Sequence, residues 1–126
     1  MRHLYASRVS FALLLVLLAA VGCNKSSTPP APLAIEQLPA ALEKAFTKAK
    51  PEIKSLASQI ISSVQAKDFA KAYLDLQSLS GMTGLSQEQH SIAMRGALTV
   101  NELVQSAAAK GDETAAEAVK VYKSTK

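Results

Sequence analysis

The chain has 126 residues, of which 14 are Lys or Arg, 10 are Asp or Glu and 1 is Cys. This length fits one small domain, and a single cysteine excludes an internal disulfide. The basic excess is small and aromatic residues are few, whereas nucleic-acid-binding domains gather basic and stacking side chains on one face. We therefore expect no nucleic-acid partner.

The first part of the chain is patterned as an export signal. Residues 1–10 carry Arg2 and Arg8 and no acid, and an unbroken apolar run follows at 11–21. A positive segment followed by a short apolar run is typical of a signal peptide. The run is shorter than the roughly 20 residues that a membrane-spanning helix needs, which disfavours a permanent transmembrane anchor.

The run ends in Ala20-Val21-Gly22-Cys23, which resembles the lipobox of bacterial lipoproteins, where small residues precede a cysteine. The resemblance implies that a signal peptidase cleaves between Gly22 and Cys23 and removes residues 1–22. It further implies that Cys23 carries a diacylglycerol on its sulfur and an acyl chain, such as palmitate, on its new amine. A plain secretory signal and an uncleaved membrane helix are the alternatives.

A lipobox places the mature chain in the bacterial cell envelope, anchored to a membrane by the lipid on Cys23 and facing the periplasm. Asn24 stands where an Asp would favour retention in the inner membrane, which favours the outer membrane, although Lys25-Ser26 resembles a retention signal of some bacteria. Residues 23–34 are rich in Ser and Pro and predict a solvated, semi-extended linker. Residues 35–126 are the predicted domain.

The domain sequence predicts helices. One apolar stripe runs at spacings of three and four through Ile35, Leu38, Leu42, Phe46, Ala49, Ile53, Leu56, Ile60 and Val64. Pro51 lies inside the stripe, and a proline either kinks a helix or starts a new one. Because the phase of the stripe is unbroken across Pro51, the pattern favours one long kinked helix over two helices.

Capping residues mark the later helices. Asp68 predicts an N-cap for a helix over 69–79, and Gly81 a left-handed helix end. Ser86 with Gln89 forms a capping box that opens a helix reaching about residue 110. The buried stripe of that helix is expected at Ile92, Ala93, Ala97, Val100, Leu103 and Ala107. Gly111 is then expected to end that helix, and Asp112 to cap a last helix that contains Ala115, Ala116, Val119 and Tyr122.

No segment alternates as a strand does, so the predicted fold class is all-α, a small bundle of about four helices arranged as helical hairpins. Residues 67–74 and 110–117 share a faint repeat in which Asp68 precedes Ala72 as Asp112 precedes Ala116. This pattern resembles the hairpin turn of tetratricopeptide-like repeats and implies that such stacking is possible. The offset from Asp68 to Asp112 is longer than the repeat of that family, which is about 34 residues.

Motifs for catalysis are missing from the mature sequence. His90 is the only histidine after residue 22, so a metal site would lack ligands, and no nucleophile motif is present. We expect no enzyme, no catalytic residue, no cofactor and no metal. The sequence favours a membrane-tethered helical structural or protein-interaction module with an envelope protein partner. The alternative is a module that binds a small apolar ligand or lipid between alanine-lined helices, which needs a cavity of several hundred cubic ångströms.

Overall fold

The computed structural model describes residues 30–125, and within them every regular element is an α-helix. The helices are α2 (Leu38–Phe46), α3 (Pro51–Gln65), α4 (Phe69–Ser80), α5 (Gln87–Ala109) and α6 (Glu113–Ser124). The all-α fold class is therefore confirmed. The predicted signal peptide, its cleavage point at Gly22 and Cys23, and the linker as far as residue 29 lie outside the described residues.

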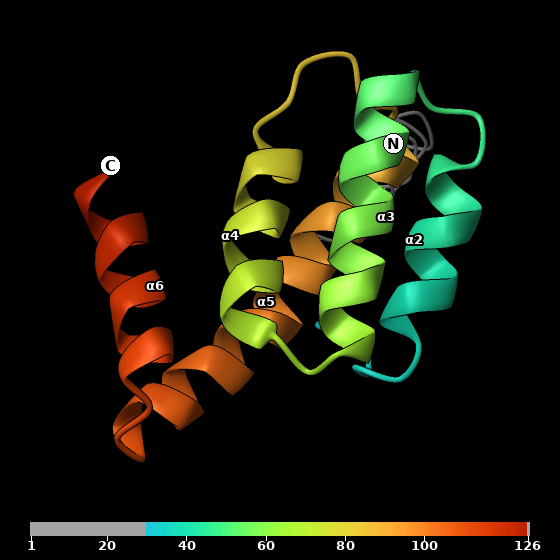
Figure 1. The fold of residues 1–126 in the computed structure, drawn as a ribbon. Helices are drawn as coiled ribbons and strands as arrows, with labels where there is room; N and C mark the ends of the chain where they lie inside the picture. The colour runs from blue at the N-terminus through green and yellow to red at the C-terminus, as the bar shows by residue number, and fades with distance from the viewer. Residues whose placement is uncertain (1–29, 126) are drawn as a thin grey trace, which may run out of the picture.

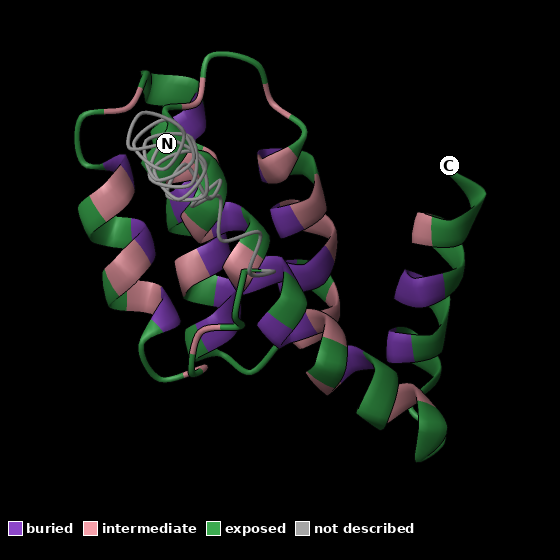
Figure 2. Cartoon of the chain, turned by 180° about the vertical axis from the view of Figure 1, so that it is seen from behind, coloured by how far each residue is buried: buried purple, intermediate pink, exposed green. Residues whose placement is uncertain are grey.

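Helices α2 to α5 form a four-helix bundle (Figure 1). Each helix packs against the next one along the chain, and α2 closes the ring by packing against α5. The lower half of α5 extends past the bundle in Figure 1 and leads into α6, which turns back and packs against α5 and α4. The bundle buries one continuous core, and the outer faces of all the helices are exposed (Figure 2).

The long helix predicted across Pro51 is instead two helices, so the kinked-helix prediction is wrong. Helix α2 ends at Phe46, and Lys50 has an extended backbone, with ψ of 149°. A residue before proline avoids the helical region because the proline ring clashes with it, and Pro51 then takes the first helical position of α3. The stripe keeps its phase because both arms of the resulting hairpin face the same core.

The predicted helix starts are confirmed. Asp68 and Asp112 each accept a hydrogen bond from the backbone N–H three residues later, at 3.2 and 3.0 Å. Ser86 and Gln89 form the reciprocal capping box, with bonds of 3.1 and 3.0 Å. These local bonds satisfy N–H groups that a helix leaves without intrahelical partners, so the start of each helix is set by its own sequence.

The turns before α4 and α6 have the same backbone geometry. Lys67 and Gly111 are both left-handed, with φ of 59° and 95°. The N–H groups of Asp68 and Asp112 donate to the carbonyl five residues earlier, at 2.8 and 3.1 Å, which is the Schellman arrangement. Lys67 and Gly111 are separated along the chain by the same offset as Asp68 and Asp112, so the sequence repeat and the turn geometry share one offset.

Two finer predictions about turns and faces are wrong. Gly81 has a right-handed backbone, and Gly84, with φ of 83°, is the left-handed glycine of that loop. Ala72 is buried but its repeat partner Ala116 is exposed, and Ala115 is buried in its place. The repeat therefore holds for the geometry of the turns but not for the burial of the two alanines.

The two turns differ in the residue at the left-handed position, which is Lys67 in one and Gly111 in the other. A Cβ in the left-handed region costs about 1 kcal/mol or more, and Lys67 already bears this cost whereas Gly111 does not. We expect Gly111→Ala to lower the free energy of unfolding by about 1 kcal/mol, and Lys67→Ala to change it little. Urea denaturation measures both. If Gly111→Ala and Lys67→Ala lowered the free energy of unfolding equally, the left-handed positions of the two turns would not be equivalent.

Tyr73 of α4 contacts Tyr122 of α6, and this contact links α6 to the bundle. Their rings meet edge to face, with centroids 5.5 Å apart and planes at 74°, which is a favoured aromatic geometry. Tyr73 is fully buried, and burial, with a smaller contribution from Tyr122, raises the pKa of the Tyr73 phenol. The neutral phenol is therefore favoured in the folded state.

This pKa shift predicts a loss of stability in alkali. Above about pH 10 an unfolded tyrosine ionises, while folded Tyr73 still holds its proton. The folded state then binds more protons, so the free energy of unfolding falls as pH rises beyond that value. We expect Tyr73→Phe to flatten this decline in urea titrations between neutral and strongly alkaline pH. An unchanged slope in Tyr73→Phe would show that other groups cause the decline.

Candidate functional site

The residues predicted to carry chemistry are placed as follows. Cys23 and Gly22 lie outside the described part. His90 is exposed near the start of α5, and between residues 30 and 125 no three His, Cys, Asp or Glu side chains come close enough to hold a metal ion. In the same range, none of the helices has the length and apolar character needed to cross a bilayer.

The end of the predicted linker is attached to the domain. Residues 30–34, which we call the strap, lie along α5 and are held there by two side chains. Arg95 Nε donates to the Ala31 carbonyl at 2.9 Å, and Thr99 Oγ1 donates to the Leu33 carbonyl at 2.5 Å. Leu33 is half-buried against the core. This part of the segment, predicted to be solvated, is thus tied to α5.

The strap has a defined direction. Ala31 is bonded at Arg95 and Leu33 one turn further along α5, so the strap runs parallel to that helix. Helix α2 then runs the opposite way, because Leu38 lies beside Gly96 and the Ala45 carbonyl accepts from Gln89 Nε2. Followed backwards, the chain therefore leaves the fold toward the end that holds the α2–α3 turn.

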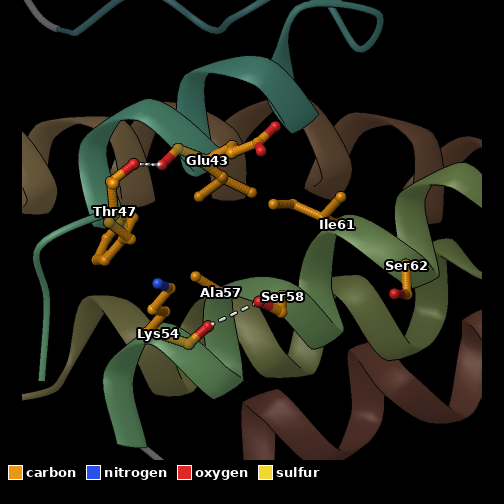
Figure 3. Close-up of a pocket in the computed structure, with 9 residues that line it drawn as sticks. Glu43, Thr47, Lys54, Ala57, Ser58, Ile61 and Ser62 are labelled. Atoms are coloured by element: carbon orange, nitrogen blue, oxygen red, sulfur yellow. Dashed lines mark hydrogen bonds between the residues drawn. The ribbon is translucent and has the colours of Figure 1, made fainter. Parts of the chain in front are cut away.

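A groove of about 360 Å³ lies between α2 and α3. Figure 3 shows Glu43 and Thr47 of α2 and its following turn facing Lys54, Ala57 and Ser58 of α3 across this groove. Its remaining lining residues are Leu42, Phe46, Ile61 and Ser62. Sequence analysis missed the groove because it treated this stretch as one helix.

The groove has an apolar floor and a polar rim. Leu42 and Phe46 are fully buried beneath it, so Ile61, which is half-buried, offers more of the apolar contact. The hydroxyls of Thr47 and Ser58 donate to backbone carbonyls of their own helices, at 2.6 and 3.0 Å. Their oxygens remain free to accept hydrogen bonds, so the rim suits a polar occupant as well as an apolar one.

Helix α5 exposes an apolar pair on its outer face. Met94 and Leu98 are one turn apart, and each is 39% exposed. Val121 of α6, at 40%, is the remaining large apolar side chain of the described residues with comparable exposure. Single exposed apolar residues are ordinary on protein surfaces, whereas two on adjacent turns form a contact surface that another helix or loop can cover.

Together these features describe a small helical bundle with the strap along α5, a groove between α2 and α3 and an exposed apolar pair on α5. Comparison with protein-family models, with curated proteins and with solved structures finds no match to this chain.

Proposed function

We propose that this chain is a lipid-anchored protein of the bacterial cell envelope, facing the periplasm, whose helical domain is a structural or protein-interaction module. The observation that carries the proposal is the Ala20-Val21-Gly22-Cys23 motif at the end of the apolar run that begins at Phe11. Cys23 is a lipid attachment point in this proposal and has no catalytic role. The domain acts without enzyme activity and without a cofactor.

The exposed pair of Met94 and Leu98 supports an interaction role. Both side chains lie on α5, the helix that also holds the strap. Interfaces enrich methionine and other apolar side chains at their centres. The proposed partner is an envelope protein that covers this face, and the tether keeps the domain close to partners in the same membrane.

Cross-linking in the native envelope tests the proposal. The full chain is cross-linked lightly, purified from the detergent-solubilised envelope and compared with Cys23→Ser. A second comparison pairs Met94→Gln/Leu98→Gln with Val121→Gln. We expect one specific envelope protein that Cys23→Ser and the α5 double variant lose and that Val121→Gln keeps. Recovery of the protein without any specific partner would overturn the interaction role.

The groove between α2 and α3 supports a second candidate, a binding module for a small apolar ligand or lipid. Its volume of about 360 Å³ is at the lower end of ligand pockets, although Ala57 is its one lining alanine and its rim is polar. Mass spectrometry of the purified protein tests this candidate. A co-purifying small molecule lost in Ile61→Glu but kept in Ser55→Glu, which lies outside the groove, would favour ligand binding.

The outer membrane is the proposed anchor site, because Asn24 replaces the Asp that favours retention in the inner membrane. Lys25-Ser26 supports the opposite assignment. Separation of inner and outer membranes by density distinguishes the two. We expect the protein in the outer-membrane fraction. If the unchanged protein were in the inner-membrane fraction and only Lys25→Asn/Ser26→Asn moved it to the outer-membrane fraction, Lys25-Ser26 would be acting as a retention signal.

A further inference from the structure

The direction of the strap bears on how the domain meets a membrane. Four lysines lie in and beside the α2–α3 turn, and we call this set the lysine turn: Lys44, Lys48, Lys50 and Lys54. All four are exposed. Among the described residues, none of their ammonium groups has a carboxylate within 4.0 Å, since the ion pairs are Lys71 with Asp75 and Lys120 with Glu117. Their charges are therefore available to an external anion.

The two ends of the bundle differ in charge. The acids nearest the lysine turn are Glu43, Glu52 and Glu88, the last being at the start of α5, so basic side chains exceed acids there. The opposite end holds the α3–α4 and α5–α6 turns, which line one pocket together. Its charged residues are Lys67, Lys71 and Lys110 against Glu36, Asp68, Asp112 and Glu113, so acids exceed basic side chains there by one. That end is acidic and the end of the lysine turn is basic.

The chain also leaves the fold toward the basic end. Ala31 is held at Arg95, six residues along α5 from Gln89, which contacts the end of α2. At 1.5 Å per residue this is a distance of about 9 Å. Eight peptide units separate Cys23 from Ala31 and can span at most about 29 Å.

These lengths limit how far the lysine turn can be from the membrane. Beyond the level of the α2–α3 turn, the chain back to Cys23 can add at most about 20 Å. The Debye length is about 8 Å at physiological ionic strength, so the lysines lie within about two and a half Debye lengths of the headgroups even at full extension. The direction of the strap and the charge asymmetry are separate observations, and both point to the same end.

We infer that the lysine turn docks on anionic phospholipid headgroups of the membrane that holds Cys23. The inference rests on the proposed lipid anchor and deepens it. Docking orients the bundle with the lysine turn against the membrane. The start of the strap is then directed toward the membrane, and the acidic end with the α3–α4 and α5–α6 turns is directed away from it. The axis of α5 then lies roughly along the membrane normal, and the outer face of this helix is open to a partner in the periplasm.

Energy transfer to the bilayer tests this orientation. The mature, lipidated chain is reconstituted into vesicles of phosphatidylethanolamine with phosphatidylglycerol, or with phosphatidylcholine as the uncharged match. A thiol probe is placed at Thr47→Cys, beside the lysine turn, or at Thr114→Cys, at the acidic end, while lipid blocks Cys23. We expect stronger transfer to labelled headgroups from position 47 than from position 114 in the anionic vesicles, and a smaller difference at high salt or with phosphatidylcholine.

Charge removal sharpens the test. Each lysine close to an anionic surface contributes about a fivefold preference, so Lys48→Ser/Lys50→Ser is expected to lower the ratio of docked to undocked protein about 25-fold. Lys110→Ser/Lys123→Ser removes the same charge elsewhere and is expected to leave the ratio unchanged. Equal transfer from both probe positions in anionic vesicles, or equal effects of the two double variants, would overturn the docking.

The lipid state of Cys23, measured first by intact mass, distinguishes a failure of the lipid anchor from a failure of the docking. An unmodified Cys23 would overturn the lipid anchor and the docking together. A lipidated Cys23 without a preferred orientation would overturn the docking alone and leave the anchored interaction module standing.

Discussion

Ile53→Asp is expected to unfold the domain. Ile53 lies on α3 and is 5% exposed, inside the core that all five helices share. The variant loses apolar burial and places an unpaired carboxylate in the core, a combined loss of about 4 to 5 kcal/mol. Small domains have total stabilities from about 5 kcal/mol upward. Far-ultraviolet circular dichroism should show the loss of the cooperative thermal transition.

Ser55→Asp is the matched control for this variant. Ser55 lies on the same helix and is exposed, so the same new carboxylate should change the melting temperature little. A folded, monomeric Ile53→Asp protein would mean that the stripe from Ile35 to Val64 is a surface and that the core is elsewhere.

Gly96→Leu is expected to cause the second large loss. A Cβ at Gly96 would lie 2.7 Å from Leu38 Cδ1 and 3.3 Å from Leu76 Cδ2. Helix α5 is therefore close to both α2 and α4 at this point, and a leucine side chain has no space to enter. Overpacking of this kind costs about 3 kcal/mol. Denaturant titration measures the loss.

Two variants define the cause of that loss. Gly96→Ala adds a single carbon, which the end of the Leu38 side chain can yield to, and it gains helix propensity, so we expect a much smaller change. Ala109→Leu, at an exposed position of the same helix, should be nearly neutral. If Gly96→Leu were also neutral, α2 and α4 would not close on α5 at this residue.

The features that sequence predicted well are local. The caps at Asp68, Ser86 and Asp112 depend on residues within one turn, and the apolar stripe depends on helical spacing alone. Both features can be predicted without knowledge of the tertiary arrangement, because a helix start and a buried face are properties of a short segment. The all-α fold class follows from them.

The features that sequence did not predict depend on contacts between distant segments. The close packing at Gly96 has no signal in the neighbouring sequence, because it requires Leu38, which lies far earlier in the chain on α2. The strap requires Arg95 and Thr99 to meet carbonyls that lie 64 and 66 residues earlier. The break at Pro51 was misjudged because two antiparallel helices on one core keep the same phase as a single helix. The groove was missed for the same reason.

The intact mass of the mature protein tests whether Cys23 carries a lipid anchor. The full chain, with residues 1–22 in place, is expressed in a bacterial host, recovered from the membrane fraction and measured intact beside Cys23→Ser. With the anchor in place, we expect a chain that begins at Cys23 and carries diacylglycerol and acyl additions, and a Cys23→Ser protein without them. A chain that keeps residues 1–22, or one that begins at Cys23 unmodified and is recovered outside the membrane, would contradict it.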